Sequence, residues 1–183
     1  SSLEEITISS SVHSIGSYAF CGCMNLIEIT IPSSVTRIGE SAFDLCLQLK
    51  KVEILSNIET IEDSTFKRCF SLETINIPSS VTSIGNNAFK ECKSLKEISL
   101  PPNLSIIGDY AFIFCESLAN VSIPFFVTTI GISAFEGCFS IKQISIPSSV
   151  SRIGKYVFES CSSLNWISIP YWMNPENLSI NPN

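Results

Sequence analysis

The chain repeats one pattern of apolar and polar positions every 23 residues, and residues 72–94 show it most clearly. Over residues 72–77 apolar and polar side chains alternate, which is the period of a β-strand with one buried face. Pro78 then removes a backbone donor and ends the strand. The segment 81–84 has apolar residues at both ends and polar residues between them, and it predicts a second, shorter strand.

The rest of the repeat predicts how the chain returns to the next strand. Gly85 follows the second strand, where we expect a positive φ that glycine adopts without steric cost. We interpret the return segment, residues 86–92 in this unit, as a helical turn that directs Ala88, Phe89 and Cys92 inward. One unit cannot bury these side chains alone, so successive units must stack to form a core.

Columns of identical residues run through the chain at this spacing. They are the cysteines Cys23, Cys46, Cys69, Cys92, Cys115, Cys138 and Cys161, the phenylalanines Phe20, Phe43, Phe66, Phe89, Phe112, Phe135 and Phe158, and the isoleucines Ile15, Ile38, Ile61, Ile84, Ile107, Ile130 and Ile153. A fixed period of this length is the signature of a solenoid. We predict a single solenoid over residues 1–183, with coils beginning at residues 3, 26, 49, 72, 95, 118, 141 and 164 and a degenerate last coil.

The repeated motif Leu-x-x-Ile-x-Ile-Pro-x-x-Val-x-x-Ile-Gly-x-x-Ala-Phe-x-x-Cys, which extends from Leu3 to Pro170, resembles the BspA-like leucine-rich repeat. The resemblance implies an α/β fold class: a right-handed leucine-rich-repeat superhelix of about eight coils. A parallel β-sheet would form one face, with short second strands and helical turns on the other. It also implies a secreted or cell-surface protein that adheres to host cells, to extracellular-matrix proteins such as fibronectin, or to other microbes. The resemblance supplies no catalytic residues.

Composition narrows the possible partners. The formal net charge is −6, and no cluster of lysine and arginine is present that would neutralise phosphates, which argues against nucleic acid as a partner. An acidic chain is also not drawn to anionic membranes, and no apolar run has the length of a membrane span. Ser2 stands in the column of Ser71, Ser94 and Ser117, so the chain begins within a coil, and we expect it to be a segment of a longer protein whose leader and anchor lie outside it.

Residues that could carry chemistry are few. The sequence has no glycine-rich phosphate loop, no metal-spaced His/Glu pair and no nucleophile beside a histidine, so we predict no catalysis, cofactor or metal site. His13 falls in a solvent-facing column and is interpreted as a solvated side chain. We interpret the cysteine column as small buried apolar groups rather than disulfides or zinc ligands. Cys21 is the extra cysteine, and we expect it to be exposed and prone to oxidation.

An apolar patch is the first candidate binding site. The coils beginning at residues 95 and 118 carry large apolar side chains where other coils are polar: Ile113, Phe114, Phe125, Phe126 and Ile132. Exposed groups of this kind are typical of partner sites. The alternatives are that some fold back over the coil edge or meet a neighbouring copy. A further alternative is that aromatic residues at the Phe125 and Phe126 places cover the end of a coil, because Tyr171 and Trp172 hold the same two places in the last coil.

The outward positions of the first strands form the second candidate, the concave face. They include Glu28, Lys51, Glu97, Asn120, Gln143 and Trp166. Solenoids commonly bind through such an extended face, although an unselected, solvated face has the same composition. The sequence thus predicts an adhesion or protein-binding scaffold. The alternative is a structural spacer or self-associating stalk that presents another domain.

Overall fold

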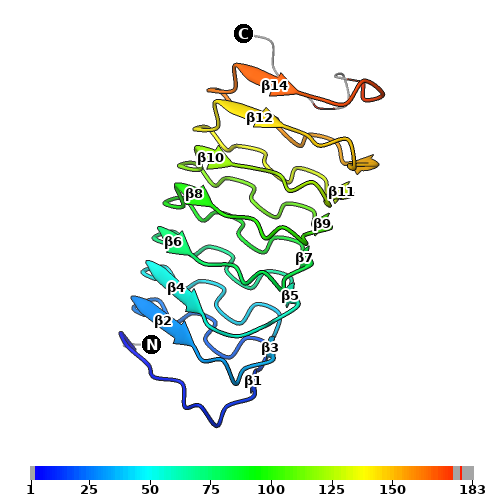
Figure 1. The fold of residues 1–183 in the computed structure, drawn as a ribbon. Coiled ribbons are helices and arrows are strands. Elements are labelled where there is room, and N and C mark those ends of the chain that lie inside the picture. The colour runs from blue at the N-terminus through cyan, green and yellow to red at the C-terminus, as the bar shows by residue number, and fades with distance from the viewer. Residues whose placement is uncertain (1–2, 175–177, 179–183) are drawn as a thin grey trace.

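The computed structural model describes residues 3–174 and 178, which form a stack of about seven coils (Figure 1). The central coils each contribute a first strand of two to four residues and a second strand of two residues at the opposite edge of the stack. The first strands are β2 (Glu28–Ile31), β4 (Lys51–Ile54), β6 (Thr74–Ile75), β8 (Glu97–Ile98), β10 (Asn120–Val121), β12 (Gln143–Ser145) and β14 (Trp166–Ser168). The second strands are β1 (Ser14–Ile15), β3 (Arg37–Ile38), β5 (Thr60–Ile61), β7 (Ser83–Ile84), β9 (Ile106–Ile107), β11 (Thr129–Ile130) and β13 (Arg152–Ile153).

All strand pairs are parallel, and the repeat sets their register. Ile61 pairs with Ile84, and Ile84 pairs with Ile107, so equivalent residues of successive coils lie side by side. The second strands β5 to β13 form one continuous ladder, whereas the first strands divide into the groups β2-β4-β6, β8-β10 and β12-β14. The predicted parallel-strand solenoid is confirmed. Part of the degenerate last coil falls at residues 175–177 and 179–183, outside the described residues.

A ladder of stacked phenylalanine rings runs through the core. From Phe20 to Phe158 each ring packs against the ring of the next coil, with centroids 5.2–5.8 Å apart and planes inclined by 2–17°. The inward-facing strand residues surround this ladder and are nearly all buried. Because each ring contacts both neighbouring coils, the apolar area that stabilises one coil depends on the coils above and below it.

The predicted helical turns are wrong, and the prediction of an α/β class is wrong with them. In the return segment Asn87 and Glu91 adopt left-handed conformations, with φ of 56° and 60°. Two such residues interrupt an α-helix, and they turn alternate N–H groups out of the coil. Thus the N–H of Phe89 donates to the carbonyl of Ala111 in the next coil at 2.8 Å, while that of Lys90 bonds within its own coil to Asn87 at 3.1 Å. The return segments therefore form a further set of bonds between coils instead of helices.

The glycine column has a different cause from the expected one. Gly85 does not adopt a positive φ; among the glycines only Gly22 and Gly137 do. A Cβ added to Gly85 would lie 2.7 Å from the backbone nitrogen of Asp63 in the preceding coil. A Cβ on Gly108 would likewise lie 2.7 Å from the carbonyl carbon of Gly85. At Gly85 and Gly108 glycine is needed because the backbone of the preceding coil lies too close for a Cβ.

We expect Gly108→Ala to lower the free energy of unfolding by about 2–4 kcal/mol, because the new methyl group meets backbone atoms that cannot rotate away. Urea denaturation followed by circular dichroism measures the change. Gly16→Ala is the matched control: it lies in the same column, but a Cβ there has no atom within 4 Å, so its stability should stay within about 0.5 kcal/mol of the wild type. Equal effects of the two substitutions would contradict close approach as the reason for the glycine column.

The coil that begins at residue 49 departs from the pattern. Leu55 stands in the proline position and is exposed, and Glu62 stands in the glycine position. The Glu62 carboxylate pairs with Arg37 of the preceding coil at 3.5 Å. The side-chain amide of Asn76, from the following coil, accepts from the Ile54 N–H at 2.7 Å and donates to the Ile54 carbonyl at 2.9 Å. Side-chain contacts here replace part of the regular backbone pairing.

The cysteine column is a second ladder beside the rings. All eight cysteines are free thiols, and those from Cys46 to Cys161 are buried, which agrees with their interpretation as small core groups. Each buried thiol also donates to a phenylalanine carbonyl of the preceding coil; Cys115, for example, donates to Phe89 at 3.2 Å. The sequence did not indicate this bond. The Phe89 carbonyl already accepts from the backbone N–H of Cys92 at 3.1 Å, so the thiol is its second donor and adds a bond between coils.

Candidate ligand-binding groove

The outward residues of the first strands share one face, as the sequence predicted. Glu28 pairs in register with Lys51, Glu97 with Asn120, and Gln143 with Trp166, and all six side chains are exposed. The alternation of each strand explains this arrangement, because the residues between these positions are the inward isoleucines and valines of the core. The face is therefore a consequence of the same period that builds the core.

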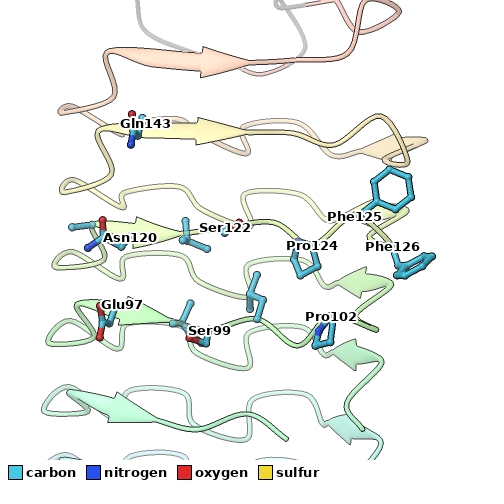
Figure 2. Close-up of a pocket in the computed structure, with 13 residues that line it drawn as sticks. Glu97, Ser99, Pro102, Asn120, Ser122, Pro124, Phe125, Phe126 and Gln143 are labelled. Carbon is cyan, nitrogen blue, oxygen red and sulfur yellow. The ribbon is translucent and has the colours of Figure 1, made fainter. Parts of the chain in front are cut away.

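A hollow of about 740 Å³ crosses this face over β8 and β10 (Figure 2). At one end lie the strand residues Glu97, Asn120 and Gln143, with Ser99 and Ser122 further along. At the other end, where the chain has left the strands, lie Pro102, Pro124, Phe125 and Phe126. The two predicted sites thus meet in one groove, which is polar at one end and apolar at the other. Ser99 and Ser122 belong to the second outward column of the first strands. The prolines of the lining were not predicted as site residues: Pro124 belongs to the repeated proline column, and Pro102 occupies the same column as Phe125.

The groove continues toward β14 because the first-strand ladder is interrupted between β10 and β12. Strand β10 pairs with β8, and β12 pairs with β14, but β10 and β12 are not paired. Val121, at the end of β10, is accordingly half-buried, whereas its equivalents Ile98 and Ile144 are buried. A second hollow of about 510 Å³ covers this junction, is bordered by Trp166, and shares Val121 and Gln143 with the first.

Phe125 and Phe126, here called the phenylalanine pair, are not part of the core. Their side chains are 66% and 59% exposed, and the two rings meet edge to face with centroids 5.6 Å apart. In another coil the position of Phe126 is held by Ser80, whose hydroxyl donates to the carbonyl of Ile58 at 2.7 Å. Phenylalanine cannot make this bond. At the position of Phe126 an exposed ring therefore replaces a serine that bonds to the preceding coil, and Phe125 adds a second exposed ring beside it. The stability of the fold explains neither ring.

The rest of the predicted apolar patch lies elsewhere. Ile113 is only 6% exposed and cannot belong to an exposed patch. Phe114 is half-buried, and its ring occupies the space that a Cβ on Gly137 would fill. Both residues belong to a return segment, and the left-handed glycine of the next coil leaves room for the ring. Ile132 is 40% exposed but does not line the groove, so only the phenylalanine pair connects the patch to the concave face.

Two residues considered for chemistry have ordinary surroundings. His13 is exposed, and its Nδ1 lies 2.8 Å from the carbonyl oxygen of Ser11. Cys21 is exposed as expected, but its thiol pKa is raised by partial desolvation and by the nearby Asp44 carboxylate and Cys23 thiol. The reactive thiolate is therefore rarer.

Within residues 3–174 and 178, no group of three or more histidine, cysteine or acidic side chains is placed to hold a metal ion. That part of the chain also contains no helix long and apolar enough to span a bilayer.

Stacked parallel strands around a single apolar core, with an extended face of outward strand residues, define a leucine-rich-repeat solenoid. The profile of the BspA type leucine-rich repeat region matches residues 1–105 and 82–178 with six copies. The chain belongs to the BspA-type leucine-rich repeat family. It is thus a member of a repeat-scaffold family, as the sequence motif indicated.

Solved bacterial structures have the same fold. A leucine-rich repeat protein from Bacteroides ovatus is 40% identical over 87% of this chain, with a TM-score of 0.82, and the T. pallidum leucine-rich repeat protein is 36% identical over 84%, with a TM-score of 0.79. A leucine-rich cell surface protein from Faecalibacterium prausnitzii is 30% identical over 93% of this chain, with a TM-score of 0.64. The chain spans 41%, 72% and 54% of these three proteins, respectively. No curated protein matches it.

Proposed function

We propose that this chain is the protein-recognition part of a cell-surface or secreted adhesin, which binds host-cell, extracellular-matrix or microbial proteins through the groove. One observation carries the proposal: the phenylalanine pair stands exposed at the groove, although Ser34, Ser80 and Ser149 hold the Phe126 position in other coils and bond there to the preceding coil. The similarity to a Faecalibacterium prausnitzii cell surface protein supports the extracellular location.

The proposed mechanism is equilibrium binding to a preformed surface rather than catalysis. The groove is built on strands that pair with their neighbours and on a core of stacked rings, so little of it has to become ordered on association. Buried aromatic side chains commonly dominate the binding energy of protein interfaces, and the phenylalanine pair offers two large apolar groups side by side. The amide and hydroxyl groups around Asn120 and Ser122 would then supply the directional hydrogen bonds.

The test replaces the phenylalanine pair with the serines typical of the repeat, as Phe125→Ser with Phe126→Ser. We expect saturable binding of the purified wild-type chain to epithelial cells, or to at least one member of a panel of extracellular-matrix proteins. The double variant should bind at least about tenfold more weakly, because an aromatic anchor of this size is typical of an interface hot spot. Surface plasmon resonance on the matrix panel and flow cytometry on cells measure the two affinities.

A matched control separates a specific site from general loss of aromatic surface. Tyr18→Ser removes an aromatic side chain that is 58% exposed on a return segment, from a column where Ser41 and Ser64 are already present. It should keep full binding, and both variants should unfold in urea like the wild type. Undiminished binding by the double variant would contradict the proposal. Binding by neither form, together with a mass that rises with concentration in light scattering, would favour a self-associating stalk instead.

A further inference from the structure

We propose that the groove binds an extended peptide segment that carries a basic side chain and, about four residues away, an apolar one. The basic side chain would pair with Glu97 at the polar end, and the apolar one would pack on the phenylalanine pair. This inference rests on the proposed function, because it names the chemistry of the partner for that same groove.

The charge of the sheet face supports a basic partner. Its one outward lysine, Lys51, is within 3.9 Å of the Glu53 carboxylate and is partly neutralised by it. The outward carboxylates Glu28 and Glu97 take part in none of the ion pairs formed within the described part of the chain. Glu97 is also the only charged residue that lines the groove. The unbalanced charge of this surface is therefore negative.

Two lysines lie near the groove without lining it, so the only charged side chain in its lining is that of Glu97. Lys96 and Lys142 each stand one residue before the outward positions of β8 and β12, and neither lines the hollow. The carboxylate of Glu97 is left facing the groove, beside the uncharged amides of Asn120 and Gln143 (Figure 2). The Glu97 carboxylate is therefore the only charge in the lining of the groove that could pair with a cationic side chain of a partner.

The length of the groove fixes the spacing of the two anchors. Glu97 is in register with Asn120, and Phe125 lies five positions after Asn120, which corresponds to at most about 16 Å of chain. In an extended peptide, residues four positions apart project to the same side and are about 13 Å apart. The length of an arginine or lysine side chain covers the difference. The two ends of the groove can therefore be occupied by one short extended segment.

The main chain of such a segment would also find partners. Ser99 and Ser122 lie between the two anchors, and the amides of Asn120 and Gln143 lie beside Glu97 (Figure 2). Each of these side chains can bond to the N–H or C=O groups of an extended peptide. Extended peptides are commonly recognised in this way, with main-chain bonds supplying affinity and side-chain pockets supplying specificity. A second copy of this chain fits the face less well, because its net charge of −6 has the same sign as that of the groove.

The test begins with displayed random peptides of about twelve residues, panned on the wild-type chain after depletion on the Phe125→Ser, Phe126→Ser variant. We expect the enriched peptides to share an arginine or lysine and an aromatic or large aliphatic residue four positions apart, in either order. Enrichment of neutral or acidic sequences, or no enrichment over the double variant, would overturn the inference.

The enriched peptide is then synthesised and its affinity measured by fluorescence polarisation. Glu97→Gln keeps the shape of the side chain and removes its charge, so it should weaken binding about three- to fivefold at low salt. That difference should shrink in about 0.5 M NaCl, since salt screens an exposed charge pair. Glu28→Gln is the matched control, because it removes an equally exposed and unpaired carboxylate of the same face outside this groove, and it should leave the affinity unchanged.

These results distinguish the partner chemistry from the proposed function. If a matrix protein binds the wild type and not the double variant, while Glu97→Gln and added salt change nothing, the groove is a binding site but its partner is not basic. If the matrix protein and the peptides bind wild type and double variant equally, the groove itself is not the site. Competition by a soluble oligosaccharide but not by the enriched peptide would assign the groove to carbohydrate and overturn the inference.

Discussion

We expect the protein to lose stability steeply as the pH rises above about 9, because its core contains a column of thiols that cannot ionise while folded. Burial raises the pKa of the Cys46 and Cys161 thiols to about 12, compared with an ordinary value of 9.0. Desolvation also raises the pKa of the thiols between them, which are fully enclosed: Cys69, Cys92, Cys115 and Cys138.

The direction of the effect follows from proton release. Below about pH 9 the thiols are protonated in both the folded and the unfolded chain, so they add no pH dependence. Above that pH the unfolded chain releases these protons while the folded chain keeps them, until the raised folded pKa is reached. Each enclosed thiol then lowers the free energy of unfolding by about 1.4 kcal/mol per pH unit, so several together should unfold the protein within one or two units.

Urea denaturation at pH 8, 9 and 10 under reducing conditions measures this dependence. Cys92→Ala should cost some stability at pH 7, because it removes a core group and its bond to the Phe66 carbonyl at 3.2 Å. It should also reduce the slope with which the free energy of unfolding falls above pH 9, by about 1.4 kcal/mol per pH unit. Cys21→Ser, at an exposed thiol, should leave the slope unchanged. A free energy of unfolding that stays flat between pH 8 and pH 10 would show that the column is not protonated or not buried.

The second large effect is expected for Phe89→Ala, which should lower the free energy of unfolding by about 3–5 kcal/mol. The Phe89 ring is fully buried, with its centroid 5.5 Å from that of Phe66 and 5.2 Å from that of Phe112. Truncation removes both stacking contacts and leaves a cavity between two coils. Because the coils are coupled only through their neighbours, we also expect less cooperative unfolding, with the two halves of the stack melting separately.

Equilibrium urea denaturation, followed by circular dichroism and by intrinsic fluorescence, tests both parts of this prediction. Phe89→Leu keeps most of the volume and should cost clearly less than the alanine variant. Phe125→Ser is the control at an exposed ring: it should lower the free energy of unfolding by no more than about 0.5 kcal/mol, since the Phe125 side chain is 66% exposed. A similar small loss for Phe89→Ala would show that the ring ladder is not what holds the coils together.

These predictions separate the residues that hold the stack together from those proposed to bind. The ring and thiol ladders are enclosed, and the groove residues lie on the opposite side of the strands, so substitutions at one should leave the other intact. A variant that loses binding while it keeps its alkaline unfolding profile therefore reports on the site itself. Substitutions of the phenylalanine pair can therefore test binding without changing the stability of the fold.

The sequence by itself determined the repeat, the register and the outward face. Its 23-residue period brings Ile61, Ile84 and Ile107 side by side, and the alternation within each first strand places Glu97 and Asn120 outward. These features depend on a local pattern that is repeated in every coil, so a single sequence contains enough information to predict them. The buried column of Cys46 to Cys161 followed from the same regularity.

Other features were decided only by the tertiary structure, because they depend on how neighbouring coils meet. The helical interpretation of the return segment was wrong since its N–H groups bond to the next coil, and Gly85 was misinterpreted since its constraint is the backbone of Asp63. Ile113 and Phe125 look equally apolar in the sequence, yet the first is enclosed and the second borders the groove. The groove lies over the paired strands β8 and β10, and a second hollow continues it at the unpaired junction between β10 and β12. The packing between coils, rather than the pattern within one, decides both.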